Sequence, residues 1–81
     1  MSDKKVMEML EDISENIAIA NEATTKIFMN SHTLRMIQLY RPEVLDPNDE
    51  KGIAFTRIYG WIWGREVRID QDKANFVYNL E

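Results

Sequence analysis

The chain contains no cysteine, which removes all chemistry that depends on thiols. Disulfide scaffolds, thiolate zinc sites and cysteine nucleophiles are excluded. A secreted domain of 81 residues usually needs such cross-links, so we expect a cytoplasmic protein. Its three glycines, at positions 52, 60 and 64, lack the spacing of a phosphate-binding loop, and its single histidine cannot build a nitrogen-ligand zinc site by itself. We therefore predict neither a cofactor nor a metal ion.

The sequence also lacks long apolar runs and an excess of positive charge. No stretch approaches the roughly 20 apolar residues of a membrane span, and residues 1–5 lead into an acidic segment, so we expect neither a membrane segment nor a secretory signal. Ten basic residues against fourteen acidic ones give a net charge of −4, which disfavours nonspecific nucleic-acid binding. The apolar content of 44% is typical of a globular chain, and 81 residues allow one domain.

A helix is predicted over about residues 4–23 because apolar residues recur there at helical spacing. Val6, Leu10, Ile13 and Ile17 share one face. This face either covers a sheet or pairs with its copy in a dimer, since the alternating spacing of four and three residues is also a short coiled-coil seam.

A short strand and a second helix are predicted next, over about residues 25–30 and 32–40. Ser31 can cap the helix, and Pro42 ends it because the residue before a proline avoids helical angles. Ser31 and His32 are neighbours, but adjacent residues at a helix start point in different directions and no glycine-flanked turn surrounds them. We therefore predict helix initiation here, no catalytic pair, and no enzyme.

The remaining half of the chain predicts an acidic loop and three strands. Residues 41–52 are rich in turn-forming side chains and resemble a calcium loop in composition only, since the alternating ligand spacing is missing. Strands follow over about residues 53–62, 66–70 and 75–80, with Gly64-Arg65 as a hairpin turn. Together these elements predict an α+β fold, in which two helices pack on a small antiparallel sheet of three to four strands.

The clearest candidate for a functional surface is a run of aromatic and arginine residues. On a regular strand, Arg57, Tyr59, Trp61 and Trp63 share one face, and Arg65 follows in the turn. The rings either pack under the first helix or stay exposed for a partner. Tryptophan, tyrosine and arginine dominate interface hot spots, so we predict a partner-binding patch.

A looser cadence along the chain resembles small phage-encoded proteins and tailed-phage capsid-fold proteins. Their strand, helix start and glycine-containing strand are matched by Lys26–Asn30, Thr33, Ile37 and Ile58–Gly60. Ser31-His32 stands where those proteins usually have a proline, and Trp61-Ile62 where they often have proline and valine. The resemblance implies a small phage or prophage product, with a structural or host-interacting role in the host cytoplasm or the virion.

We accordingly predict a non-enzymatic interaction or structural module that self-associates as a homodimer or higher oligomer. The alternative is a nucleic-acid-binding or regulatory module that uses Arg57, Arg65, Arg68 and the two tryptophans. A third reading, an enzyme subunit whose site a second copy completes, has the least support.

Overall fold

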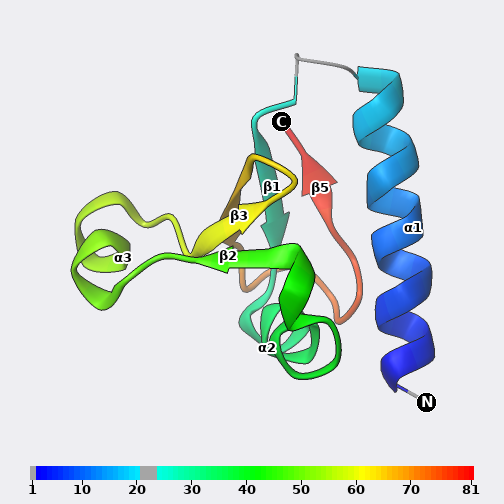
Figure 1. Ribbon diagram of the computed structural model, residues 1–81, viewed down its shortest axis with the longest axis horizontal. Coiled ribbons are helices and arrows are strands. Elements are labelled where there is room, and N and C mark those ends of the chain that lie inside the picture. The colour runs from blue at the N-terminus through cyan, green and yellow to red at the C-terminus, as the bar shows by residue number, and fades with distance from the viewer. Residues whose placement is uncertain (1, 21–23) are drawn as a thin grey trace.

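The computed structural model describes residues 2–20 and 24–81, and within them helices and a mixed sheet form an α+β fold (Figure 1). The sheet has five strands in the order β2-β3-β4-β1-β5. The elements are α1 (Ser2–Ala20), β1 (Lys26–Met29), α2 (Ser31–Tyr40), the 3₁₀ helix η2 (Pro42–Val44), β2 (Leu45–Pro47), α3 (Glu50–Thr56), β3 (Gly60–Ile62), β4 (Arg65–Ile69) and β5 (Asn79–Leu80).

The sheet is mixed, which corrects the prediction of an antiparallel sheet of three to four strands. β1 pairs in parallel with β4, and its other edge pairs antiparallel with β5. The pairs β2–β3 and β3–β4 are antiparallel. A parallel pair needs a long crossover connection, and here α2, η2, β2, α3 and β3 all lie between its two strands. Such distant pairing leaves no local signal in the sequence.

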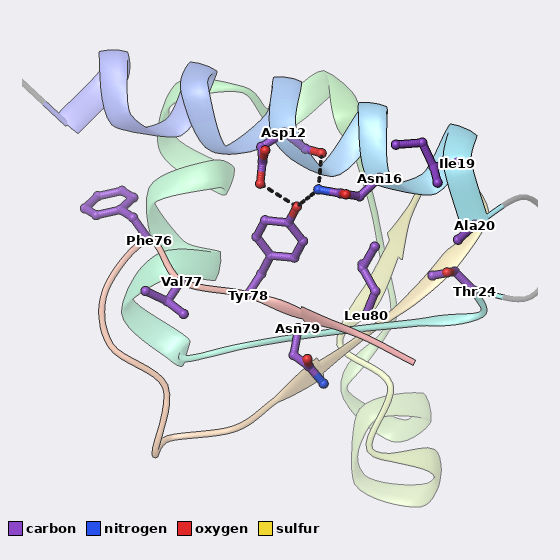
Figure 2. Close-up of a pocket in the computed structure, with 10 residues that line it drawn as sticks. All are labelled: Asp12, Asn16, Ile19, Ala20, Thr24, Phe76, Val77, Tyr78, Asn79 and Leu80. Atoms are coloured by element: carbon purple, nitrogen blue, oxygen red, sulfur yellow. Dashed lines mark hydrogen bonds between the residues drawn. The ribbon is translucent and has the colours of Figure 1, made fainter.

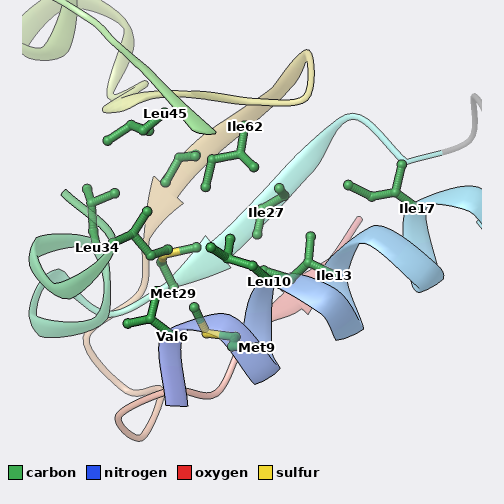
Figure 3. Close-up of a cluster of buried hydrophobic side chains, with 12 residues drawn as sticks. Val6, Met9, Leu10, Ile13, Ile17, Ile27, Met29, Leu34, Leu45 and Ile62 are labelled. Carbon is green, nitrogen blue, oxygen red and sulfur yellow. The ribbon is translucent and has the colours of Figure 1, made fainter. Parts of the chain in front are cut away.

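The apolar face of α1 lies in the core of the single chain (Figure 3). Val6, Leu10, Ile13 and Ile17 are all buried there, so α1 covers the sheet, and these side chains are not an open seam for a second copy. The buried cluster comprises Val6, Met9, Leu10, Ile13, Ile17, Ile27, Met29, Leu34, Ile37, Leu45, Ile62 and Val67. The prediction that the helix extends to residue 23 falls on residues 21–23, which lie outside the described residues.

The strand and helix predicted over residues 25–40 are confirmed, but the cap of α2 is Asn30 and not Ser31. Asn30 is buried, and its Oδ1 accepts a hydrogen bond from the Thr33 backbone N–H at 2.7 Å. Its Nδ2 donates to the carbonyl oxygen of Lys73 and to Oδ1 of Asn75, each at 2.9 Å. One side chain therefore starts α2 and fastens a distant turn to it.

Residues 41–62 depart most from the prediction of a loop followed by one long strand. The predicted loop, residues 41–52, contains η2, β2 and the start of α3, and the predicted strand, residues 53–62, contains the rest of α3 and only three strand residues, β3. Apolar residues in so short a segment fit helical and strand spacing equally well. The structure resolves that ambiguity through the groups that close the two ends of α3.

Both ends of α3 are capped by local hydrogen bonds. Asp49 accepts a bond from the Gly52 backbone N–H at 2.5 Å, which starts the helix. Arg57 adopts a left-handed conformation, with φ of 63°, and its N–H donates to the Ile53 carbonyl at 2.8 Å, which ends the helix. A side-chain acceptor before the first turn and a left-handed residue after the last are the usual helix boundaries.

The strand predicted over 66–70 is confirmed as β4, whereas the one predicted over 75–80 is reduced to the two residues of β5. Phe76 has a positive φ of 61°, which no strand residue adopts. Its N–H donates to Thr33 Oγ1 at 2.9 Å, so the chain is bound to α2 before it reaches the sheet.

Candidate functional site

The turn between β3 and β4 consists of Trp63 and Gly64, one residue earlier than predicted. Ile62 pairs directly with Arg65, and the two residues between them have φ of 48° and 78°. A two-residue hairpin turn with both φ positive favours Asn-Gly. A bulky side chain in the left-handed region is uncommon and costs about 1–2 kcal/mol. Trp63 therefore occupies a position where asparagine would cause less backbone strain.

Arg65 holds this turn against the start of β1. Its Nη1 donates to the Trp63 carbonyl at 2.8 Å, and its Nε donates to the Thr24 carbonyl at 3.3 Å. Arg65 was predicted to bind a partner, but these two bonds give it a positioning role: they fix the backbone that presents Trp63.

The Trp63 indole lines an apolar hollow between α1 and the segment after α2. Trp63 is 41% exposed, and the hollow has a volume of about 420 Å³. We call it the Trp63 hollow. Its apolar wall consists of Met7, Leu10, Val44 and Trp63, and its polar rim consists of Glu11, Ser14, Arg41 and Glu43. An apolar floor inside a charged rim is the usual anatomy of a protein interface.

The other predicted patch residues lie elsewhere, so the single strand face predicted from the sequence is wrong. Trp61 is half-buried in β3, between Gly60 and Ile62, which are both buried. By strand alternation its ring faces away from the core. Arg57 is the C-cap of α3 and belongs to no strand. Trp61 and Trp63 are thus separated because the turn begins at Trp63.

Arg57 and Tyr59 do lie together, in a second hollow of about 430 Å³ on the outer side of the sheet. Its lining comprises Phe28, Arg57, Tyr59, Arg68, Ile69 and Gln71. We call it the outer hollow. Sequence reasoning missed Phe28, although its position between the inward residues Ile27 and Met29 predicts an outward ring.

A third hollow, of about 710 Å³, lies between α1 and the C-terminal segment (Figure 2). Asn16 Nδ2 donates to the Tyr78 hydroxyl at 2.6 Å, and that hydroxyl donates to Asp12 Oδ2 at 2.7 Å. Burial, together with the bond to Asp12, raises the pKa of Tyr78 to about 12. The phenol is therefore protonated at neutral pH and serves as a hydrogen-bond donor, not as a base.

The serine and histidine weighed as a catalytic pair have separate partners. Ser31 Oγ lies 3.0 Å from Gln71 Nε2, which donates to it. The exposed His32 ring meets Phe76 edge-on, with 6.1 Å between ring centroids. Within the described part of the chain, Ser31 bonds to Gln71 and His32 packs on Phe76, so each side chain takes part in local packing.

Among residues 2–20 and 24–81, histidine, aspartate and glutamate side chains nowhere gather in threes as a metal ion would require. In the same described part of the chain, every helix is too short or too polar to cross a bilayer.

No protein-family model matches this chain, and no curated protein or solved structure shows significant similarity to it. Any function is therefore inferred from the geometry of the chain itself.

Proposed function

We propose that this chain is a non-enzymatic protein-interaction module that self-associates through the Trp63 hollow. The observation that carries the proposal is the position of Trp63. It stands at a left-handed turn residue, where asparagine would fit better, yet its indole is the wall of an apolar hollow. Strained backbone of this kind clusters at functional sites.

The chemistry of the hollow suits a protein partner. Tryptophan is among the residues most enriched in interface hot spots, where it sits in an apolar centre surrounded by a polar rim. Met7, 42% exposed, adds a flexible side chain that adapts to different partner shapes. Because homo-oligomers are the commonest soluble assemblies, a second copy is the first partner to test.

The experiment is size-exclusion chromatography with light scattering over a wide range of protein concentrations. We expect the mass of the wild-type chain to rise with concentration, and that of Trp63→Asn to stay at one chain. Ile19→Ala is the matched control, because Ile19 is 82% exposed but lies outside the Trp63 hollow. A wild-type chain that remains monomeric at the highest concentration would contradict the proposal.

The biological setting stays a prediction. The resemblance to small phage proteins favours a phage or prophage product in the host cytoplasm or the virion. A structural or host-interacting role of that kind is compatible with self-association, since such assemblies are built from repeated copies of small chains.

The outer hollow favours a second candidate function, the binding of single-stranded nucleic acid. It places the rings of Phe28 and Tyr59 beside the guanidinium groups of Arg57 and Arg68, and stacked bases with phosphate contacts need both kinds of group. Glu66 accepts a bond from Arg68 Nη2 at 2.7 Å and offsets part of its charge. Fluorescence anisotropy with a single-stranded oligonucleotide at low salt tests this candidate, because the electrostatic contribution is largest there. Loss of binding in Arg68→Gln would support it, and no binding by the wild type would end it.

A further inference from the structure

The helix α3 projects from the body of the protein beyond the ends of β2 and β3 (Figure 1). All seven of its residues are described, and none is buried. A helix this short gains little stability from its own hydrogen bonds, and α3 adds no side chain to the buried cluster. Burial in the single chain therefore does not explain why the segment is helical and apolar.

Phe55 is the most prominent side chain of α3. It is 91% exposed, more than any other large apolar side chain in the described part of the chain. Lys51 lies four residues earlier and shares its helix face, and Arg57 follows at the C-cap. The helix thus presents one aromatic ring with one cation, Lys51, on the same face.

We infer that Phe55 of one copy docks into the Trp63 hollow of a second copy. The inference rests on the proposed self-association and names the segment that fills the site. A cavity of about 150 Å³ is large enough to hold benzene, so the hollow of about 420 Å³ has room for the Phe55 ring. There it would meet the Trp63 indole and the apolar side chains of α1, a favourable pairing of aromatic surfaces.

Charge supports the same pairing. Glu11 and Glu43 stand on the rim of the hollow, opposite in sign to Lys51, which shares the helix face of the docking ring. Arg41 also lies on the rim. Its Nη1 is 3.7 Å from Glu43 Oε1 and offsets part of the negative charge of Glu43. Complementary charges around an apolar contact set the orientation of the partner and speed its capture.

The positions of the two surfaces determine the form of the assembly. The Trp63 hollow is bounded by α1, and α1 and α3 stand on opposite sides of the molecule (Figure 1). A copy cannot fill its own hollow, and each copy that donates Phe55 keeps its hollow open. Such a head-to-tail contact produces rings or chains. One projecting helix buries less area than a standard interface, so association is weak and depends on concentration.

A mixing experiment tests the pairing directly. Phe55→Ala keeps the hollow and lacks the ring, and Trp63→Asn keeps the ring and lacks the hollow wall. Each variant alone should remain monomeric in sedimentation velocity, with affinity at least tenfold weaker than the wild type, as expected for loss of a hot-spot side chain. An equimolar mixture should form dimers and stop there. Ile19→Ala, the exposed apolar control, should assemble as the wild type does.

The outcomes separate this inference from the proposed function. If the wild type and Phe55→Ala assemble equally, Phe55 is not the docking ring, although self-association stands. If the mixture stays monomeric while the wild type assembles, the two surfaces do not meet and the inference is overturned. If the wild type is monomeric throughout, both the inference and the proposed self-association fail. Lys51→Glu, which reverses charge beside the ring, should weaken assembly and more so at low salt.

Discussion

Replacing Trp63 by asparagine should disturb the fold less than replacing it by alanine. Both variants lose the buried part of the indole. Trp63 is 41% exposed, so about three-fifths of its surface is covered; on a side chain that can bury up to about 250 Å², this is about 150 Å². At about 25 cal/mol per Å² the loss is about 4 kcal/mol, which a compact unfolded chain reduces to about 3 kcal/mol.

The two variants differ in the turn. With φ of 48° at this residue, asparagine tolerates the left-handed conformation, whereas alanine does not. We therefore expect Trp63→Asn to be more stable than Trp63→Ala by about 1 kcal/mol. Because neither variant keeps the indole, self-association does not contribute to the difference.

Urea unfolding followed by circular dichroism measures both free energies at one low protein concentration. Gly64 provides the control: with φ of 78° and no atom near its missing side chain, Gly64→Ala should be destabilising through backbone strain alone. If Trp63→Ala proves equal to or more stable than Trp63→Asn, the turn is not left-handed at Trp63. The strained position that carries the proposed function would then be lost.

Three further predictions concern the fold. Asn30→Ala should lower the free energy of unfolding by about 2 kcal/mol or more, since a helix cap and two further hydrogen bonds are lost; urea unfolding checks this, and an unchanged midpoint would refute it. Gly60→Ala should be severely destabilising, because its methyl group would stand 2.6 Å from the Asp46 carbonyl oxygen; a variant as stable as the wild type would contradict the close approach. The raised pKa of Tyr78 means that the folded state holds this proton more tightly, so its contribution to stability is full below pH 10 and is lost as the pH rises through about 12. Tyr78→Phe should lack that loss in unfolding experiments over this range, and equal pH dependence of both proteins would show the raised pKa to be wrong.

The first two helices, α1 and α2, and the buried face of α1 were predictable because their signals are local. The apolar spacing of Val6, Leu10, Ile13 and Ile17 fixes the inner face of α1. The polar residues before α2 mark its start, although the cap is Asn30 and not the predicted Ser31. Both features act within one or two helical turns. The hydrogen bonds that join α2 to the C-terminal turn, by contrast, depend on contact between Asn30 and residues more than forty positions away.

The sheet and the site were less predictable for the same reason. The parallel pairing of β1 with β4 depends on packing across the core, and the residues of the two strands do not by themselves predict it. The prediction of a single aromatic face was wrong because Arg57 is the C-cap of α3 (Glu50–Thr56) and the turn begins at Trp63. A shift of one residue in a turn moves every following side chain to the other face, so the predicted residues do not share one face.

The most direct test of the central claim is sedimentation equilibrium of the wild-type chain beside Trp63→Asn, over the widest concentration range the protein allows. Self-association through the Trp63 hollow predicts a wild-type mass that climbs with concentration, while the variant remains at the mass of one chain. Equal masses for the two proteins at every concentration, whether both assemble or neither does, would contradict it.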